Sequence, residues 1–248
     1  MTSFFDITST LPWPNAIGKR TAIGPLLGAA ESEAVSELAK TTPLILVITA
    51  TTAAAHNLAS ELPFFLSEHR EILLVPDWET LPYDNFSPHE DIVSDRLRAL
   101  SRLPTLETGI VIASITTLMH RLAPRHFIDA GVLSLKTGDT LHAEQFVRNL
   151  TRNGYRSVDT VYEHGEFATR GSLLDVFPMG SDEPLRIDLF YGEIESLRSF
   201  DPETQRTAQR LDSIDLLPAR EFPLHSDAIE RFKIDWYRSF DGDPERCS

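Results

Sequence analysis

The chain has 248 residues, 42% of them hydrophobic and 24% charged, which is the composition of a globular protein of one or two domains. No apolar run approaches the ~18 residues of a membrane span, and the N-terminal stretch lacks the basic start and apolar block of a secretory signal. The net charge of −14 disfavours autonomous nucleic-acid binding, which depends on Lys and Arg, and favours protein partners. The single cysteine, Cys247, excludes a disulfide framework, so we expect a protein of the reducing cytoplasm.

Helix and strand patterns alternate between residues 22 and 120, which predicts a parallel sheet wrapped by crossover helices. We expect helices over residues 31–40, 52–65 and 91–103, a fourth helix from Thr116, and strands over residues 44–49, 72–75 and 110–113. The stretch LILVIT at residues 44–49 is continuously apolar, which predicts a strand buried on both faces. Thr51 or Thr52 is expected to cap the second helix, and Pro63 to kink or end it.

From Gly131 the pattern changes to that of an α+β module with an antiparallel sheet. We expect one helix over residues 142–152 and short strands over residues 157–162, 167–177, 185–190 and 194–200. Tyr191-Gly192 joins the last two strands as a predicted hairpin turn. The boundary between the modules is expected at residues 124–131. A helix over residues 228–240 follows the module, and the chain stops so soon after it that we expect part of a longer protein.

A glycine-bearing turn opens the first predicted helix, within GPLLGAAESEAVSELA at residues 24–39, where a nucleotide-binding loop would stand. In a working GxxxxGK[ST] loop the Lys contacts the phosphates and the Ser or Thr holds Mg²⁺. Here the turn carries Gly28, then Ala30 in place of the second glycine, Glu31 in place of the Lys, and Ser32. A carboxylate repels phosphate, so we expect a plain strand-to-helix turn, with residual nucleotide binding as the alternative.

The stretch PLRIDLF at residues 184–190 has the alternation of a half-buried strand. Its aliphatic face is predicted to point inward and consists of Leu185, Ile187 and Leu189. Its other face is predicted to point outward and consists of Arg186, Asp188 and Phe190, with Arg170 of the ATRG turn joining it across the sheet. Arg beside an exposed aromatic residue is typical of a protein interface. The alternative is a cross-strand salt bridge with the Phe covered by a loop.

Other sequence motifs give only weak indications of metal binding or catalysis. The eight histidines show no metal-ligand spacing, and no GxSxG nucleophile motif is present. Carboxylates gather at residues 76–91, PDWETLPYDNFSPHED, where Asp77, Glu79 and Asp84 lie beside Trp78, Tyr83 and Phe86. Paired carboxylates can perform acid–base chemistry. The alternative is a long loop that its aromatic residues pin to the surface of the domain.

Two long motifs carry a family resemblance: EHGEFATRGSLLDVFPMGSDEPLRIDLFYGEIESLRSFDPETQRT at residues 163–207, and VPDWETLPYDNFSPHEDIVSDRLRAL at residues 75–100. Both closely resemble the N-terminal region of bacterial transcription-repair coupling factors (Mfd), and the resemblance extends from about Gly24 to Phe240. That region is similar to the excision-repair subunit UvrB.

The resemblance implies an α/β fold in two parts: a degenerate P-loop, helicase-like domain 1A with a parallel sheet, and an α+β domain 2 with an antiparallel sheet. We expect domain 1A at residues 25–130 and domain 2 at residues 131–217. Residues 1–24 and 218–248 are expected to be part of a truncated domain 1B.

The function implied by the resemblance is recruitment of UvrA, the damage-recognition subunit of nucleotide excision repair, to lesions at stalled RNA polymerase. The UvrA-binding residues of the family fall on Arg170, Arg186, Asp188 and Phe190. The resemblance implies no catalysis and no cofactor in this region. ATP, Mg²⁺, RNA polymerase and double-stranded DNA belong to other domains of the full-length protein, one of which is expected to mask domain 2 by an intramolecular contact.

Two other functions remain open from the sequence. One is a nucleotide-binding ATPase domain with an atypical phosphate loop. The other is a DNA-binding damage sensor, which the net charge disfavours and for which no aromatic-rich hairpin insertion is evident.

Overall fold

The structure is a computed structural model that describes residue 13 and residues 17–80 and 84–240. Cys247 and Tyr83 lie outside the described residues. The fold is mixed α/β, with one parallel sheet and two largely antiparallel sheets, so the predicted class is confirmed at this level. Two compact units divide the chain: the first runs up to Asp77 and includes Arg102–Arg121, and the second holds Trp78–Ser101 and the chain from Leu122.

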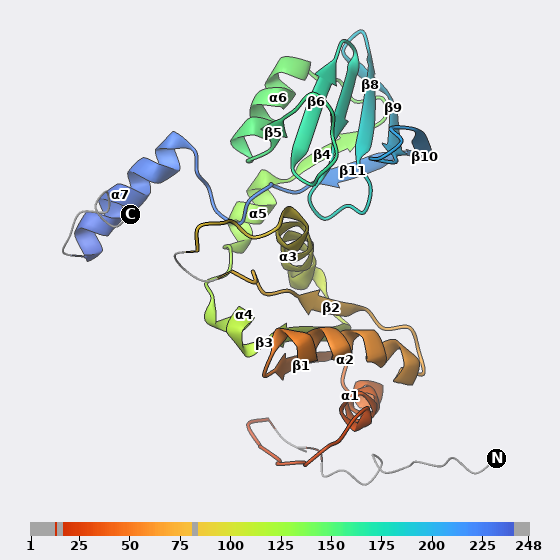
Figure 1. Ribbon diagram of the computed structural model, residues 1–248, viewed down its shortest axis with the longest axis vertical. Coiled ribbons are helices and arrows are strands. Elements are labelled where there is room, and N and C mark those ends of the chain that lie inside the picture. The colour runs from red at the N-terminus through yellow and green to blue at the C-terminus, as the bar shows by residue number, and fades with distance from the viewer. Residues whose placement is uncertain (1–12, 14–16, 81–83, 241–248) are drawn as a thin grey trace. The chain divides into compact units, whose positions relative to one another are not determined.

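The first unit is built on a parallel three-stranded sheet, shown in Figure 1. The strand order is β1 (Leu44–Thr49), β3 (Gly109–Ser114), β2 (Ile72–Val75), and every residue of the central strand β3 is buried. Helix α2 (Thr52–Phe65) packs across the strands and α1 (Ala30–Thr41) packs against α2. Two short helices complete the unit: η2 (Leu103–Thr105) and α4 (Ile115–Met119).

The burial of strand β1 differs from the expectation. Its residues alternate in burial, and Leu44, Leu46 and Ile48 are 44%, 57% and 52% exposed, so the prediction of a strand buried on both faces was wrong. Ile45 belongs to the core that α1 and α2 cover. The continuous apolar run is typical of a strand with elements on both sides, whereas the described residues cover only one side of β1.

Helix α2 begins at the predicted cap. The Thr51 side chain accepts a hydrogen bond from the Ala54 backbone N–H at 3.1 Å. Pro63 lies inside the last turn and the helix continues to Phe65, so the proline ends the helix later than expected. Pro63 has no backbone N–H, so the hydrogen bond that this position would make to the preceding turn is missing, and the helix ends two residues later.

Replacing Thr51 with alanine is expected to lower the stability of α2 by about 1 kcal/mol, because one N-terminal amide loses its acceptor. Hydrogen exchange of the α2 amides measures the change. The Thr52→Ala variant is the control, since the Thr52 hydroxyl makes no cap hydrogen bond. Equal exchange in both variants would contradict the assignment of Thr51 as the cap.

The second unit is built on a six-stranded sheet with the order β10-β9-β8-β7-β6-β5. All neighbouring strands are antiparallel except β5 and β6. The strands are β5 (Arg156–Ser157), β6 (Glu166–Arg170), β7 (Leu173–Val176), β8 (Leu185–Phe190), β9 (Glu193–Phe200) and β10 (Thr207–Leu211). The hairpin turn predicted between β8 and β9 is confirmed, with φ of 50° at Tyr191 and 83° at Gly192.

The main core of the second unit lies on one face of this sheet. Helix α6 (Ala143–Arg152) contributes Phe146 and Leu150, and α3 (Glu90–Arg102) contributes Leu97. A two-stranded antiparallel sheet of β4 (Leu133–Lys136) and β11 (Ser213–Leu216) adds further apolar side chains.

Two more helices belong to the second unit. Residues 124–131, the expected boundary, form α5 (Arg125–Gly131) with its N-cap, and the division into compact units falls just before them, between Arg121 and Leu122. Helix α7 (Ser226–Ser239) has no buried residue. None of the described helices has the length and apolar character needed to cross a membrane.

A buried polar network fixes the loop that begins at Trp78. The Trp78 indole N–H donates to Glu221 Oε1 at 2.8 Å, and the Arg96 guanidinium lies 5.0 Å from the centre of the Trp78 ring. Arg96 is fully buried and donates to both Glu221 oxygens, at 2.5 and 3.1 Å. Phe86 is 67% exposed, so Trp78 pins this loop and Phe86 does not.

Candidate docking face of the six-stranded sheet

The register of the six-stranded sheet places the predicted site residues on one face. Arg170 of β6 pairs with Leu173 of β7, and Leu173 pairs with Asp188 of β8. The next row joins Asp175, Arg186 and the β9 residue Arg198. Directly paired residues of a sheet point to the same side. We call this side the polar face, made of Arg170, Asp175, Arg186, Asp188 and Arg198.

The opposite face is the core of the unit. Leu185 and Ile187 are 1% and 0% exposed, and they pack with Leu174, Val176 and Leu197 of the neighbouring strands. Leu189 packs against the same cluster. Strand alternation therefore leaves Arg186, Asp188 and Phe190 on the side away from this core.

Arg186 lies on the polar face, but it already has a partner. Its Nε and Nη2 donate to the two oxygens of Asp175 at 2.7 and 2.9 Å, and its Nη1 donates to the Gln205 carbonyl at 3.2 Å. Its guanidinium stacks 4.7 Å from the centre of the Phe200 ring. The hydrogen bond with the Asp175 carboxylate raises the pKa of Arg186. The cross-strand salt bridge that the sequence left open is therefore present, and the Arg186 side chain is only 18% exposed.

Asp175 is the residue that sequence reasoning missed. Its side chain is 4% exposed, and it holds Arg186 in one orientation. The available signal was an acidic residue within the apolar stretch LLDVF, since a buried carboxylate needs a cationic partner.

Arg170 and Asp188 are more open than Arg186. Arg170 is exposed, and its Nη2 donates to the Asp159 carbonyl at 2.6 Å and to Thr160 Oγ1 at 2.8 Å. Asp188 is half-buried, and its side chain has no hydrogen bond or ion pair within the described part of the chain. A guanidinium held at one nitrogen and an unsatisfied carboxylate can both bind groups of a partner.

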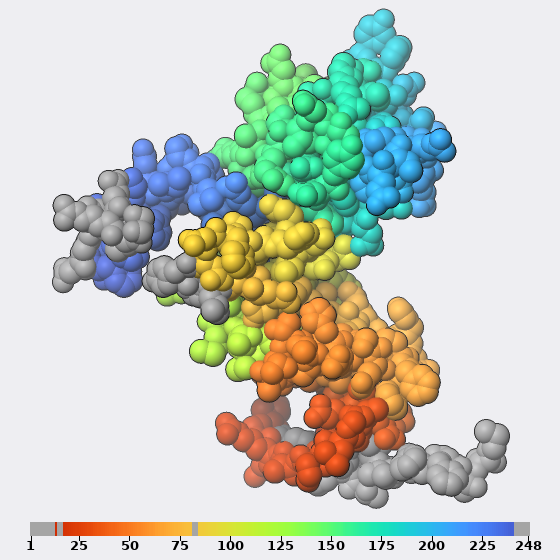
Figure 2. Space-filling model, in the orientation of Figure 1, coloured from red at the N-terminus to blue at the C-terminus, as the bar shows by residue number. Residues whose placement is uncertain are grey.

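Phe190 provides an exposed apolar contact at the end of β8. It is 60% exposed, and its ring meets Tyr191 edge to face at 4.6 Å. Tyr191 is 96% exposed. The tip of the β8–β9 hairpin protrudes at the top of the space-filling view (Figure 2). No loop covers Phe190 within the described residues, so this half of the alternative expectation is not met.

The turn at Gly28, where the sequence analysis expects a degenerate phosphate loop, has a different character. Gly28 has a φ of 60° and leads into α1, whose first residue is Ala30. Glu31 and Glu33 lie in the first helical turn, where their negative charge opposes anion binding. Ser32 is 1% exposed, and its hydroxyl donates to the Glu61 carboxylate of α2 at 2.8 Å. The hydroxyl therefore bonds between helices, and the described residues hold no cluster of three potential metal ligands.

Part of the chain matches a known family of protein domains. Residues 133–222 match the family model described as the UvrB interaction domain, and the whole polar face lies within this range. Over most of its length the chain is also similar to transcription-repair-coupling factors, and the resemblance read from the sequence is confirmed. Residues 133–222 are therefore similar to a UvrB interaction domain, and most of the chain is similar to part of these factors.

The similarity to individual relatives is extensive. The transcription-repair-coupling factor of Escherichia coli (strain K12) is 44% identical over 236 residues, which cover 94% of this chain and 20% of that protein. The factor of Haemophilus influenzae is 45% identical over 88% of this chain and 19% of that protein. The factor of Bacillus subtilis (strain 168) is 31% identical over 82% of this chain and 17% of that protein. The chain therefore spans about a fifth of the length of these relatives.

Proposed function

We propose that this chain is the N-terminal part of a transcription-repair coupling factor and that it recruits UvrA through the polar face and Phe190. The match of residues 133–222 to the UvrB interaction domain carries the proposal, because that range contains every residue of the face. The exposed Phe190–Tyr191 pair beside Arg170 and Asp188 supports it, since interfaces concentrate aromatic residues and Arg.

We assign the parts of the chain as the resemblance implies. Residues 25–130 are domain 1A, residues 131–217 are domain 2, and residues 1–24 and 218–248 belong to domain 1B. Domain 1A is proposed to be catalytically inactive, which the acidic first turn of α1 supports. RNA polymerase, double-stranded DNA and ATP are partners of the whole protein through other domains.

A titration of the chain with purified UvrA tests the proposal. The Arg170→Ala/Arg186→Ala variant is expected to weaken binding by about 2 kcal/mol or more, roughly 30-fold, as truncation of interface hot spots does. Arg125→Ala is the control, because Arg125 is exposed on α5, is not part of the polar face, and among the described residues pairs only with Asp129 of the same helix. Unchanged affinity of the double variant would contradict the proposed site.

The aromatic contact is tested separately. Phe190→Ala is expected to weaken UvrA binding at least tenfold, with little change in stability because the ring is already exposed. Phe64→Ala, which removes an 86% exposed ring from α2, is the matched control. An equal loss for both variants would indicate nonspecific apolar association.

A further inference from the structure

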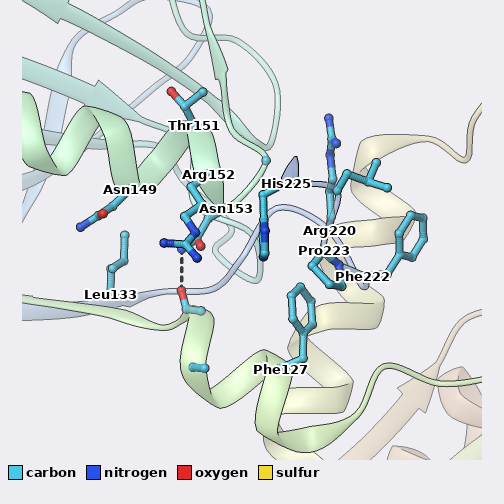
Figure 3. Close-up of a pocket in the computed structure, with 14 residues that line it drawn as sticks. Phe127, Leu133, Asn149, Thr151, Arg152, Asn153, Arg220, Phe222, Pro223 and His225 are labelled. Atoms are coloured by element: carbon cyan, nitrogen blue, oxygen red, sulfur yellow. Dashed lines mark hydrogen bonds between the residues drawn. The ribbon is translucent and has the colours of Figure 1, made fainter. Parts of the chain in front are cut away.

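A cavity of about 480 Å³ lies in the second unit, away from the polar face. Three segments form it: the end of α5 with the start of β4, the end of α6, and the chain at residues 220–225 (Figure 3). Its cationic lining side chains are Arg152 and Arg220, and no carboxylate is among its lining residues. Figure 3 shows Arg152 and Arg220 on opposite sides of His225 in that view.

The walls of the cavity are fixed by close packing. Gly154 has a φ of 97°, and a Cβ at this position would lie 2.8 Å from Arg220 Cγ, so the Arg220 stem packs directly on the Gly154 backbone. The Asn153 side-chain amide donates to the Gly131 carbonyl at 2.8 Å, the bond dashed in Figure 3. The Ala219 N–H donates to the Asn153 carbonyl at 2.8 Å. Packing and hydrogen bonds therefore hold the backbone segments around the cavity in place.

The charge of the two arginines is not neutralised by an ion pair. Four other arginines of the same unit each contact a carboxylate: Arg96, Arg98, Arg156 and Arg186. Neither the Arg152 nor the Arg220 side chain has a hydrogen bond or ion pair among the described residues. Glu221, which follows Arg220, is buried, and its carboxylate already accepts hydrogen bonds from Arg96 and Trp78.

One further carboxylate lies near the cavity. Glu90 is close enough to Arg220 for their charges to interact, but burial still raises the pKa of Glu90, and it forms no ion pair with Arg220. His225 caps the 14-residue helix α7, whose first turn also carries Asp227, so the helix N-terminus adds little positive potential. The balance of charge at the cavity is therefore positive although the whole chain is acidic.

The remaining walls are apolar. Phe127, Leu133, Phe222 and Leu224 line the cavity, and Phe222 and Leu224 are 51% and 48% exposed. A guanidinium group suits a phosphate, and exposed aromatic rings suit a flat apolar group. The volume lies within the range of about 300–1,000 Å³ typical of small-molecule sites. We propose that this cavity binds a phosphate monoester that carries an aromatic ring, of which a nucleoside monophosphate is the simplest kind.

Isothermal titration of the whole chain with adenosine monophosphate, adenosine and inorganic phosphate tests the proposal. We expect adenosine monophosphate to bind at least tenfold more tightly than either part alone. Arg152→Gln and Arg220→Gln should each weaken its binding at least tenfold. Arg148→Gln is the matched control, because Arg148 lies on α6 outside the cavity lining and should change affinity less than twofold. Glutamine retains most of the Arg220 stem that packs on Gly154, and unchanged thermal unfolding verifies the fold.

Several results would overturn the proposal. Absence of saturable binding at millimolar adenosine monophosphate would exclude it. Binding that survives both the Arg152 and Arg220 changes would place the nucleotide elsewhere, for example at the Gly28 turn. An equal loss in the Arg148 variant would indicate nonspecific attraction, and tighter binding of a glutamate-rich peptide than of adenosine monophosphate would assign the cavity to an acidic peptide.

Discussion

Replacing Glu221 with alanine is expected to lower the free energy of unfolding of the second unit by about 3–5 kcal/mol, the cost of breaking a buried ion pair. Arg96 is fully buried, so the variant would leave a guanidinium without its counter-ion in a site closed to water. The Trp78 indole N–H would lose its acceptor as well. Urea unfolding followed by circular dichroism measures the effect.

A second ion pair on α3 is the control for this experiment. Arg98 contacts Asp182 at 2.7 Å, but the Asp182 side chain is 87% exposed. Asp182→Ala is therefore expected to cost no more than about 1 kcal/mol. The Arg96→Met/Glu221→Leu variant should recover much of the loss, because apolar replacement of a buried pair removes the desolvation cost along with the attraction. Equal effects for Glu221→Ala and Asp182→Ala would show that the network contributes little.

Replacing Asp175 is expected to give the second large loss of stability. Its carboxylate is 4% exposed and accepts two hydrogen bonds from Arg186. Asp175→Ala should lower the free energy of unfolding by about 2–4 kcal/mol, because Arg186 would remain mostly buried without its carboxylate partner. It should also weaken UvrA binding by up to about 30-fold, the loss expected for the Arg170→Ala/Arg186→Ala variant, if the orientation of Arg186 is what the partner recognises.

The Asp188→Ala variant separates an effect on stability from an effect on UvrA binding. Asp188 is half-buried and unpaired within the described residues, so its removal should change stability by less than about 1 kcal/mol while still weakening UvrA binding. Asp175→Ala could instead destabilise the unit but leave UvrA binding intact. In that case Arg186 only stabilises the sheet, and the proposed contacts with UvrA are limited to Arg170, Asp188 and Phe190.

Local patterns predicted some elements of this fold well, but the strand expected over residues 157–162 is only the two-residue β5, and the strand expected over residues 167–177 is two strands, β6 and β7. Strands at residues 44–49, 72–75 and 185–190 have the expected bounds, because apolar runs and strict alternation are local signals. Strand β10 (TAQRL) and strand β11 (SIDL) were not predicted, since both are short and have few buried residues. The exposed face of β1 could not be predicted either, because it depends on which other elements cover the sheet.

The candidate site was predictable as a face but not as a set of contacts. Alternation in β8 places Arg186 and Asp188 opposite the aliphatic residues. The Asp175–Arg186 pair depends on the register between β7 and β8, which the turn residues do not specify. The Arg96–Glu221 pair joins residues 125 positions apart, and no local pattern identifies such partners.

The left-handed turn at Tyr191-Gly192 has a consequence for association. A two-residue turn with positive φ at both positions matches the twist of the flanking strands, so the Phe190–Tyr191 pair stands on a rigid support. Arg186 is likewise locked before any partner arrives. Little conformational entropy remains to be lost on docking, and a partner meets a surface that is already shaped for it. Differences in affinity among variants of this surface should then arise mainly from how fast the complex dissociates.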